Sequence, residues 1–273
     1  MLRIDAAYLY EFGATLRPVS QLSESDTKPI NIYLSLWPVR ESINKLVYGS
    51  VFAGSLKTVL NSAKSLIDTI DQILPKFEVG QDWETLIPGR KISQIKKSFQ
   101  TFEAIVVAEM QTWDLYYVLP KGGFNTTYLT DHGEEIFSTE LASKVPGALA
   151  DLKAATRCIA FELPNAAAFH LHRANEVVLR VYWDNVTGGQ NHPSEKNMGI
   201  YLRELNSLDR GKKEVREHLK SIKDLHRNPL MHPDQNIESI DQAIDLMAAI
   251  RCSIGYMLRE IETTPLQTAL PLN

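Results

Sequence analysis

The 273-residue sequence is poor in cysteine, has no long apolar run and carries no excess of positive charge. Its two cysteines, Cys158 and Cys252, lie in apolar helical patterns and match no metal-ligand or redox spacing, so we expect two buried thiols in a reducing compartment. No stretch approaches the roughly 18 uninterrupted apolar residues of a membrane-spanning helix. These absences argue against a disulfide-rich secreted domain and against a transmembrane protein.

The N-terminal residues show no basic segment followed by an apolar core, so we expect no signal peptide and predict a cytoplasmic protein without a membrane partner. A formal net charge of -4 gives no global field for nucleic acid, so any RNA binding must come from a local patch. With 44% hydrophobic and 23% charged residues, the chain can bury a globular core. Its length allows one large domain or two ordinary ones.

The sequence predicts a mainly α fold, and residues 1–140 read as a mostly helical N-terminal region of unknown function. Apolar residues recur at helical spacing over about 48–74 and 92–113. Near 115–130, two β-rich segments flank a Pro-Lys-Gly-Gly turn, which predicts a small β-hairpin. An alternation of apolar residues over 30–36 permits a short strand.

Residues 146–262 predict a bundle of four to five helices, followed by a loose tail over 263–273. The caps expected for two of these helices are Ser194 and Ser239. The expected helices span about 146–162, 165–186, 195–205, 212–227 and 240–261.

The helix over 212–227 carries a cationic face. At about 100° per residue, five cationic side chains fall within about 80° of one another. This basic ridge consists of Lys212, Arg216, Lys220, Lys223 and Arg227. The apolar stripe beside it consists of Val215, Leu219, Ile222 and Leu225, with His218 and His226 near it as packing residues. The ridge could follow an RNA phosphate backbone, or it could be a solvated face that flanks the core stripe.

The ridge ends at Arg227, and His232 follows five residues later. An arginine can hold a phosphate and a histidine can move a proton near neutral pH, which together suit RNA cleavage. The spacing alone is a weak signal, because 13 arginines and 7 histidines supply about 0.33 such pairs by chance. Pro229 ends or kinks the helix, so His232 could turn back toward Arg227. Asn228 could hold the turn or bind a substrate oxygen.

The helix over 165–186 is apolar around most of its circumference, which predicts a central helix or one that faces a partner subunit. Its narrow polar strip consists of Arg173, Glu176 and Arg180. Glu176 could belong to an ion-pair ladder, or it could orient the residues of the Arg227–His232 segment. His170 and His172 lie on opposite sides of this helix and cannot chelate one metal ion.

The stretch Arg227-Asn228-Pro229-Leu230-Met231-His232 resembles the Arg-x(4–6)-His signature of the HEPN superfamily (higher eukaryotes and prokaryotes nucleotide-binding), in its common form with Asn after the Arg. The segment FHLHRANE, residues 169–176, is similar to the earlier helix of bacterial HEPN proteins, which supplies a polar residue to the site. The resemblance covers about 146–262, and residues 1–140 are assigned to no family.

The resemblance implies a metal-independent endoribonuclease with no cofactor, in which a homodimer brings two signatures to one cleft and RNA is cut through its own 2′-hydroxyl. It implies that His232 is the general acid/base, Arg227 holds the scissile phosphate, Asn228 supports the geometry and Glu176 is an accessory polar residue. A role in phage defence or toxin–antitoxin biology would add an antitoxin or defence-system protein as a partner.

The sequence departs at one position from a subgroup of the HEPN superfamily. HEPN toxins that pair with small nucleotidyltransferases carry a tyrosine two residues after the signature histidine, where this chain has Asp234. That pairing is therefore not expected here.

Two other hypotheses remain open. The chain could be a non-catalytic HEPN-like module that binds RNA or nucleotides, or that dimerises and recruits a partner. It could also be a helical scaffold in which Arg227 only neutralises a helix dipole.

Overall fold

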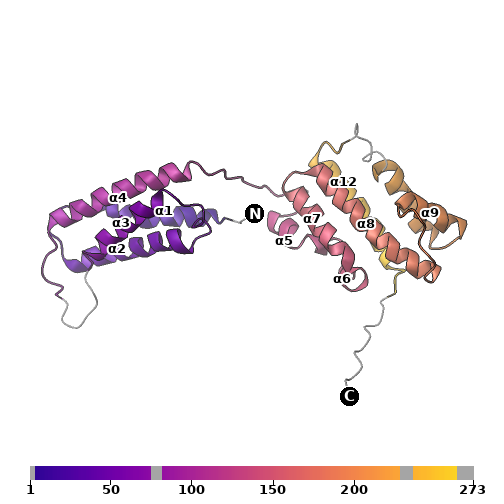
Figure 1. The fold of residues 1–273 in the computed structure, drawn as a ribbon, viewed down its shortest axis with the longest axis horizontal. Coiled ribbons are helices and arrows are strands. Elements are labelled where there is room, and N and C mark those ends of the chain that lie inside the picture. The colour runs from indigo at the N-terminus through magenta and orange to yellow at the C-terminus, as the bar shows by residue number, and fades with distance from the viewer. Residues whose placement is uncertain (1–3, 75–81, 228–235, 263–273) are drawn as a thin grey trace, which may run out of the picture. The chain divides into compact units, whose positions relative to one another are not determined.

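The computed structural model describes residues 4–74, 82–227 and 236–262. The described chain is mainly α, as expected, and it divides into two compact units (Figure 1). The N-terminal unit is Met1–Leu115 and the C-terminal unit is Tyr116–Asn273. Each unit has its own hydrophobic core.

The described residues of the N-terminal unit form a four-helix bundle. Each helix contacts two others, so that α1 meets α2, α2 meets α3, α3 meets α4 and α4 returns to α1. The core comes from apolar residues at helical spacing on all four helices. The elements are α1 (Ala6–Gln21), α2 (Pro29–Asn44) with a π-helical turn after it (Lys45–Gly49), α3 (Val59–Asp71) and α4 (Gly89–Met110).

The strand permitted over 30–36 is wrong, because these residues belong to α2. Ile32 and Leu36 are fully buried, whereas Ile30 and Leu34, the other half of the alternation, are 40% and 65% exposed. Residues four apart share one face of a helix, so only one half of the pattern faces the core. Pro29 occupies the first turn, where its missing N–H costs no hydrogen bond.

The helix expected over 48–74 is shorter than the apolar pattern. Phe52 and Leu56 pack in the core, but they lie in turns ahead of α3. Glu109 on α4 marks the start of α3, since its carboxylate accepts hydrogen bonds from the backbone N–H groups of residues 57–59, two of them at 3.1 and 2.8 Å. The N-terminal cap of α3 is therefore supplied by a distant side chain, which local sequence does not reveal.

The β-hairpin predicted near 115–130 is wrong in the described structure. Lys121 and Phe124 form one isolated bridge, and the residues of the expected second strand form α5 (Thr126–Asp131). Asn125 begins this helix, because its side chain accepts a hydrogen bond of 2.7 Å from the backbone N–H of Tyr128. An asparagine cap thus outweighs the β propensity of the residues that follow it.

The chain divides at Leu115 rather than near residue 140. Residues after that point contribute Leu129, Ile136 and Leu141 to the core of the C-terminal unit. Besides α5, the short elements η2 (Gly133–Ile136) and α6 (Leu141–Lys144) belong to this unit.

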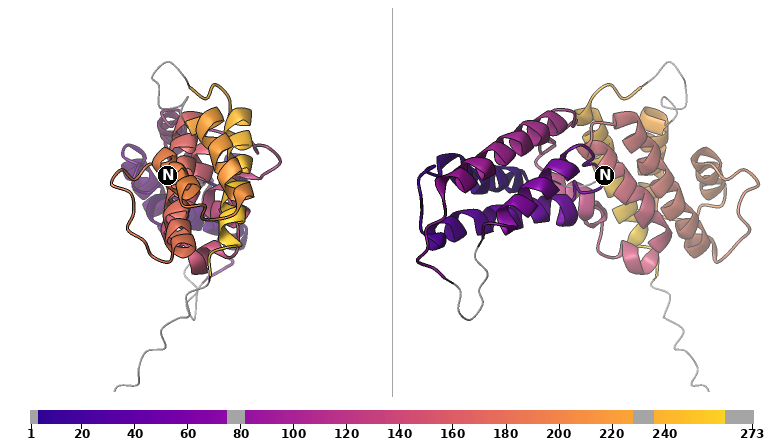
Figure 2. Two further views of the ribbon diagram at one scale, coloured as in Figure 1. Left: turned by 90° about the vertical axis from the view of Figure 1, so that its right-hand side faces the viewer. Right: turned by 60° about the vertical axis from the view of Figure 1, so that its left-hand side comes forward.

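The C-terminal unit is built around α8, which contacts α7, α9 and α12. This arrangement agrees with the prediction that the helix over 165–186 is central, and Figure 2 shows the helices of this unit from two further sides. The elements after α6 are η3 (Pro146–Ala148), α7 (Leu149–Ala160), α8 (Pro164–Thr187), α9 (Met198–Ser207), α10 (Lys213–Ile222), the π-helical turn η4 (Lys223–Arg227) and α12 (Ile240–Leu258).

Of the two expected caps, one is confirmed. Ser239 caps α12 by accepting a hydrogen bond of 3.2 Å from Gln242 N. The cap of α9 is Asn197 rather than Ser194, so that helix begins later than expected.

Cys252 is exposed, contrary to the prediction of a buried thiol.

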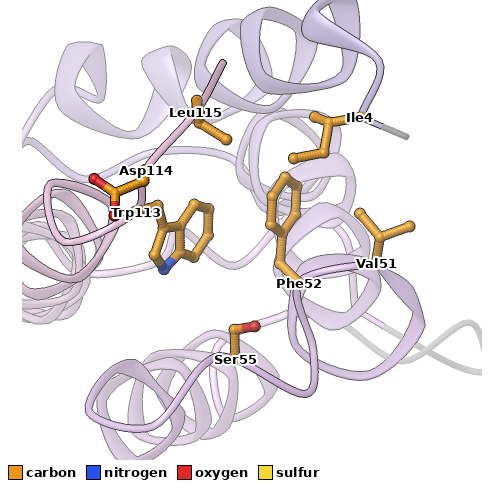
Figure 3. Close-up of a pocket in the computed structure, with 7 residues that line it drawn as sticks. All are labelled: Ile4, Val51, Phe52, Ser55, Trp113, Asp114 and Leu115. Atoms are coloured by element: carbon orange, nitrogen blue, oxygen red, sulfur yellow. The ribbon is translucent and has the colours of Figure 1, made fainter. Parts of the chain in front are cut away.

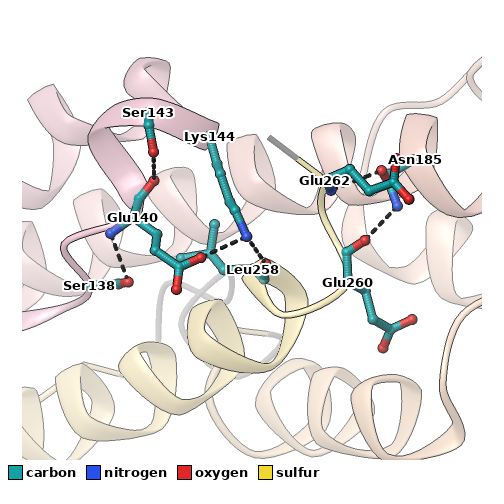
Figure 4. Close-up of polar contacts among 8 residues, drawn as sticks. All are labelled: Ser138, Glu140, Ser143, Lys144, Asn185, Leu258, Glu260 and Glu262. Atoms are coloured by element: carbon teal, nitrogen blue, oxygen red, sulfur yellow. Dashed lines mark hydrogen bonds and ion pairs between the residues drawn. The ribbon is translucent and has the colours of Figure 1, made fainter. Parts of the chain in front are cut away.

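The C-terminal end of α12 is tied to the rest of its unit by polar contacts (Figure 4). Lys144 donates a hydrogen bond of 2.8 Å to Leu258 O and pairs with Glu140 at 2.6 Å. Asn185, near the end of α8, donates to Glu260 O at 2.6 Å and accepts from Glu262 N at 3.2 Å. The bond from Lys144 satisfies a carbonyl group that the end of α12 leaves without a partner inside the helix, and those to Asn185 hold the residues that follow the helix.

Candidate functional site

The segment with the Arg-x4-His spacing begins inside the described structure and continues beyond it. Arg227 is the last residue of the π-helical turn η4, which follows α10 directly. Its side chain, together with Asn228 and His232, lies outside the described residues. The structure therefore defines the element that leads into the segment.

The π-helical turn changes which residues face the core. Leu225 was expected in the apolar stripe of a regular helix, but it is 67% exposed. Val215, Leu219 and Ile222, which precede the turn, are buried as expected. A π turn has i→i+5 hydrogen bonds and advances less than 100° per residue, so the positions after Ile222 leave the face on which an α-helix would place them.

The basic ridge is not a uniform cationic face. Arg216 is 13% exposed and is engaged within the chain: it donates 2.9 Å bonds to Arg210 O and to the Asp209 carboxylate. Lys223 pairs with Asp224 at 3.0 Å. The structure therefore uses Arg216 to hold the turn before α10.

Fewer residues of the basic ridge are exposed than the regular α-helical spacing of the sequence suggests. Lys212 and Lys220 have exposed side chains. His218, expected to pack, does so: its Nε2 lies 3.1 Å from Ala249 O and its ring packs at 5.5 Å against Tyr256.

Glu176 lies half-buried on α8, in a region where several charges face Tyr201 of α9. Burial raises the pKa of Tyr201, Arg180 acts to lower it, and Asp184 and Glu176 act to raise it further. The Tyr201 hydroxyl lies 2.9 Å from His192 Nδ1, and His192 Nε2 pairs with Asp184 at 3.1 Å. Both ring nitrogens of His192 are thus engaged, which makes this cluster a structural network.

No family model, curated protein or solved structure matches this chain. Its function is therefore argued from its own residues.

Two polar residues are buried on α8 beside Glu176. His172 is 8% exposed and Asn175 is fully buried. Neither amide atom of Asn175 has a hydrogen-bond partner in the part of the chain that the structure describes. Most buried amides form hydrogen bonds, so an unpaired amide here lowers the free energy of unfolding. Sequence reasoning passed over Asn175 because burial of a single asparagine is not visible in an apolar pattern.

The N-terminal unit contains a pocket of about 270 Å³ (Figure 3). The rings of Phe52 and Trp113 stack in its wall, with centroids 4.5 Å apart. Its other lining residues are Ile4, Val51, Ser55, Asp114 and Leu115. Ligand pockets usually have volumes of about 300–1,000 Å³, so this smaller apolar space is assigned no catalytic role.

Two further findings concern the described ranges only. Within them, no three side chains of His, Cys, Asp or Glu gather in a way that could hold a metal ion. Nor does any helix there have the length and apolar character needed to cross a membrane.

Proposed function

We propose that this chain is a metal-independent endoribonuclease of the HEPN type, acting as a homodimer. The observation that carries the proposal is the segment Arg227-Asn228-Pro229-Leu230-Met231-His232, which begins at the last residue of a π-helical turn, in a unit whose described residues are mainly helical. Interruptions of the α-helical pattern of this kind are frequent at functional sites, because they re-aim the residues that follow.

The proposed chemistry needs one proton carrier and one cation at each step. The 2′-oxygen of the RNA attacks phosphorus as His232 of one chain removes its proton, and the P–O5′ bond breaks as the second His232 protonates the leaving oxygen. The products are a 2′,3′-cyclic phosphate and a 5′-hydroxyl. Arg227 stabilises the charge that develops on the phosphoryl oxygens. Two chains are needed because each supplies one histidine.

The remaining site residues have supporting roles in this proposal. Asn228 holds the turn, and Glu176 orients the arginine or the histidine from α8. Lys212 and Lys220, which are exposed, contact the RNA backbone. Arg216 and Lys223 are already paired inside the chain and contribute less. We further propose a cytoplasmic role in phage defence or toxin–antitoxin biology, with an antitoxin or defence protein as partner.

A second candidate function is a non-catalytic module that binds RNA or dimerises. The observation in its favour is the pair of exposed lysines, Lys212 and Lys220, which can bind RNA phosphates without any acid–base residue. In this case RNA binding would persist in His232→Ala and no RNA would be cut.

Cleavage of a fluorescently labelled single-stranded RNA in excess EDTA tests the proposal. Wild type should cut it and leave 2′,3′-cyclic phosphate ends, while His232→Ala should lose at least about 100-fold in rate, the usual contribution of general acid–base catalysis. His132→Ala is the matched control, because His132 is exposed and belongs to no part of the proposed site. Equal cleavage by His232→Ala would refute the assignment.

The mass in solution tests the dimer. Sedimentation should give twice the chain mass of 30.8 kDa at concentrations where cleavage is observed. A strictly monomeric protein that cuts RNA would refute the shared-cleft arrangement while leaving the histidine assignment in place.

A further inference from the structure

A second group of polar side chains lies between α7 and α8. Asp151, in the first turn of α7, is 9% exposed, and its two carboxylate oxygens contact two different residues of α8. Oδ1 lies 2.8 Å from His170 Nδ1, and Oδ2 lies 3.3 Å from Arg173 Nε. One buried carboxylate therefore fixes an imidazole and a guanidinium side by side.

Both groups keep nitrogens for a ligand, as donors on Arg173 and as an acceptor on His170. Among the described residues, His170 Nε2 and the two terminal nitrogens of Arg173 have no hydrogen-bond partner. The side chains of His170 and Arg173 are 28% and 57% exposed. Asp151 thus acts as a support behind the two residues and leaves their outer nitrogens open to solvent, as supporting residues do in preorganised sites.

An aromatic ring lies beside these two side chains. Phe169 is 58% exposed on α8. The guanidinium of Arg173 lies 5.5 Å from the centre of its ring, and the His170 ring packs edge-on at 5.6 Å. Arginine and aromatic planes are the surfaces on which proteins stack unpaired RNA bases.

We propose that Phe169, His170 and Arg173, supported by Asp151, form a subsite for one nucleotide of single-stranded RNA. Arg173 donates to the phosphate oxygens. His170, whose Nδ1–H donates to Asp151, accepts at Nε2 from a sugar hydroxyl, and the base stacks on Phe169 or on the Arg173 plane. The choice of RNA rests on the proposed function, whereas the phosphate-and-base chemistry rests on these four residues alone. This subsite is separate in sequence from the Arg227–His232 segment and would hold the strand rather than cut it.

The charge of the subsite sets a quantitative expectation. Asp151 offsets the charge of Arg173, so few counterions are released when RNA binds here. Arg173→Ala should therefore reduce the slope of log affinity against log salt concentration by less than about 0.7, the value for one full phosphate contact on single-stranded RNA. The stacking contribution should persist at high salt.

Fluorescence anisotropy with a labelled oligouridylate tests the subsite. The full chain carrying His232→Ala is used in excess EDTA, so that the RNA stays intact. Added Phe169→Ala or Arg173→Ala should each weaken binding by about fivefold or more, as expected for loss of one stacked base or one phosphate contact. Both side chains are exposed, so these variants should keep the melting temperature of the parent.

Matched controls use exposed residues of the same type elsewhere. Arg203→Ala removes an arginine that is 68% exposed on α9, and Tyr10→Ala removes an aromatic ring that is 79% exposed on α1. Both should bind within about twofold of the parent, as surface changes away from a site usually do. Losses in the controls equal to those of Phe169→Ala and Arg173→Ala would refute the subsite.

Competition separates a nucleotide site from a simple anion site. Uridine monophosphate should displace the oligonucleotide at a lower concentration than inorganic phosphate, and Phe169→Ala should abolish this difference. Equal competition by the two ligands in the parent overturns the base-stacking claim, and unchanged binding in both variants overturns the subsite as a whole. If the wild type cuts RNA through His232 but Phe169→Ala and Arg173→Ala bind RNA normally, the subsite is refuted and the nuclease proposal stands. If these two variants lose binding but no RNA is ever cut, the nuclease proposal is refuted and the subsite stands.

Discussion

Asn175 combines complete burial with an unpaired side-chain amide in the described part of the chain. A buried amide without a hydrogen bond costs about 1–3 kcal/mol of stability. The residue stands next to Glu176 and one turn after His172, so this cost falls on the segment of α8 that carries Glu176. Destabilising groups of this kind are commonly retained where they serve function.

Replacement of this amide should stabilise the protein. Asn175→Leu, which keeps the branching at Cγ and is apolar, should raise the free energy of unfolding of the C-terminal unit by about 1–2 kcal/mol, because no hydrogen bond is lost. Urea unfolding followed by circular dichroism measures the change. Asn197→Ala is the control in the opposite direction, since loss of the α9 cap should cost about 1 kcal/mol. A clear destabilisation by Asn175→Leu would mean that the amide is bonded in the folded protein.

In the N-terminal unit, Glu109 is also a buried polar residue, but its carboxylate accepts hydrogen bonds from backbone N–H groups. Burial acts to raise its pKa, but hydrogen bonds from the backbone N–H groups of residues 57–59 outweigh burial and hold the pKa below the usual 4.5. A lowered pKa in the folded state means that the unfolded chain binds more protons in acid. The stabilisation is therefore complete above about pH 4.5 and declines as the pH falls through the folded pKa.

Glu109→Gln should test this cap. The neutral amide should lower the free energy of unfolding at pH 7 by about 1–3 kcal/mol, because hydrogen bonds to a charged acceptor are the stronger ones. The difference between variant and wild type should shrink as the pH falls below about 4.5, and it should vanish only below the folded pKa, where the wild-type carboxylate is itself protonated. Urea titrations across this range measure it. Glu103→Gln, an exposed position on the same helix, should change little.

At the scale of one element, the π-helical turn after α10 decides which residues reach the core. A regular helix would bury Leu225 with Ile222, whereas the structure leaves Leu225 67% exposed and Ile222 1% exposed. The difference arises from the change in angular advance per residue within Lys223–Arg227. The same change sets the direction in which the chain enters the Arg227–His232 segment.

Two substitutions distinguish the two helical registers. Leu225→Ser should change the free energy of unfolding by no more than about 0.5 kcal/mol, as is usual for an exposed position. Ile222→Ala should cost about 2–4 kcal/mol, because it opens a cavity in the core. Chemical denaturation of both variants measures this contrast. Equal, large losses would show that α10 continues as a regular α-helix through Leu225.

At the scale of the whole molecule, the chain has two hydrophobic cores and a boundary at Leu115. The N-terminal core is formed by four helices in a closed ring of contacts, and the C-terminal core surrounds α8. Units with separate cores can unfold separately, because neither core needs residues of the other.

A substitution in one core should therefore shift the unfolding transition of its own unit and leave that of the other unit unchanged. Leu66 and Leu246 are both fully buried, one in each core. Leu66→Ala should lower the stability of the N-terminal unit by about 2–5 kcal/mol, and Leu246→Ala should do the same to the C-terminal unit. Calorimetry of the full chain, with tryptophan fluorescence as a second probe, resolves the transitions. A single transition that both variants shift equally would contradict two separate cores.

Helical periodicity by itself predicted most of the long helices. The apolar spacing over 92–113 and 165–186 predicted α4 and α8, and Ser239 correctly predicted the start of α12. These features are local, because each depends on residues within a few turns of one another. The Arg-x4-His spacing and its resemblance to the HEPN signature are also properties of the sequence alone, and the assignment of a function to them remains a proposal.

The tertiary structure decided what depends on distant residues. Glu109 fixes the start of α3 from another helix, and Asp151 holds His170 and Arg173 from across a helical hairpin. The boundary at Leu115 and the exposure of Leu225 follow from packing and from a π turn, neither of which an angular projection of the sequence contains. Local patterns specify helices because their hydrogen bonds are local, but sites and cores join residues that only the folded chain brings together.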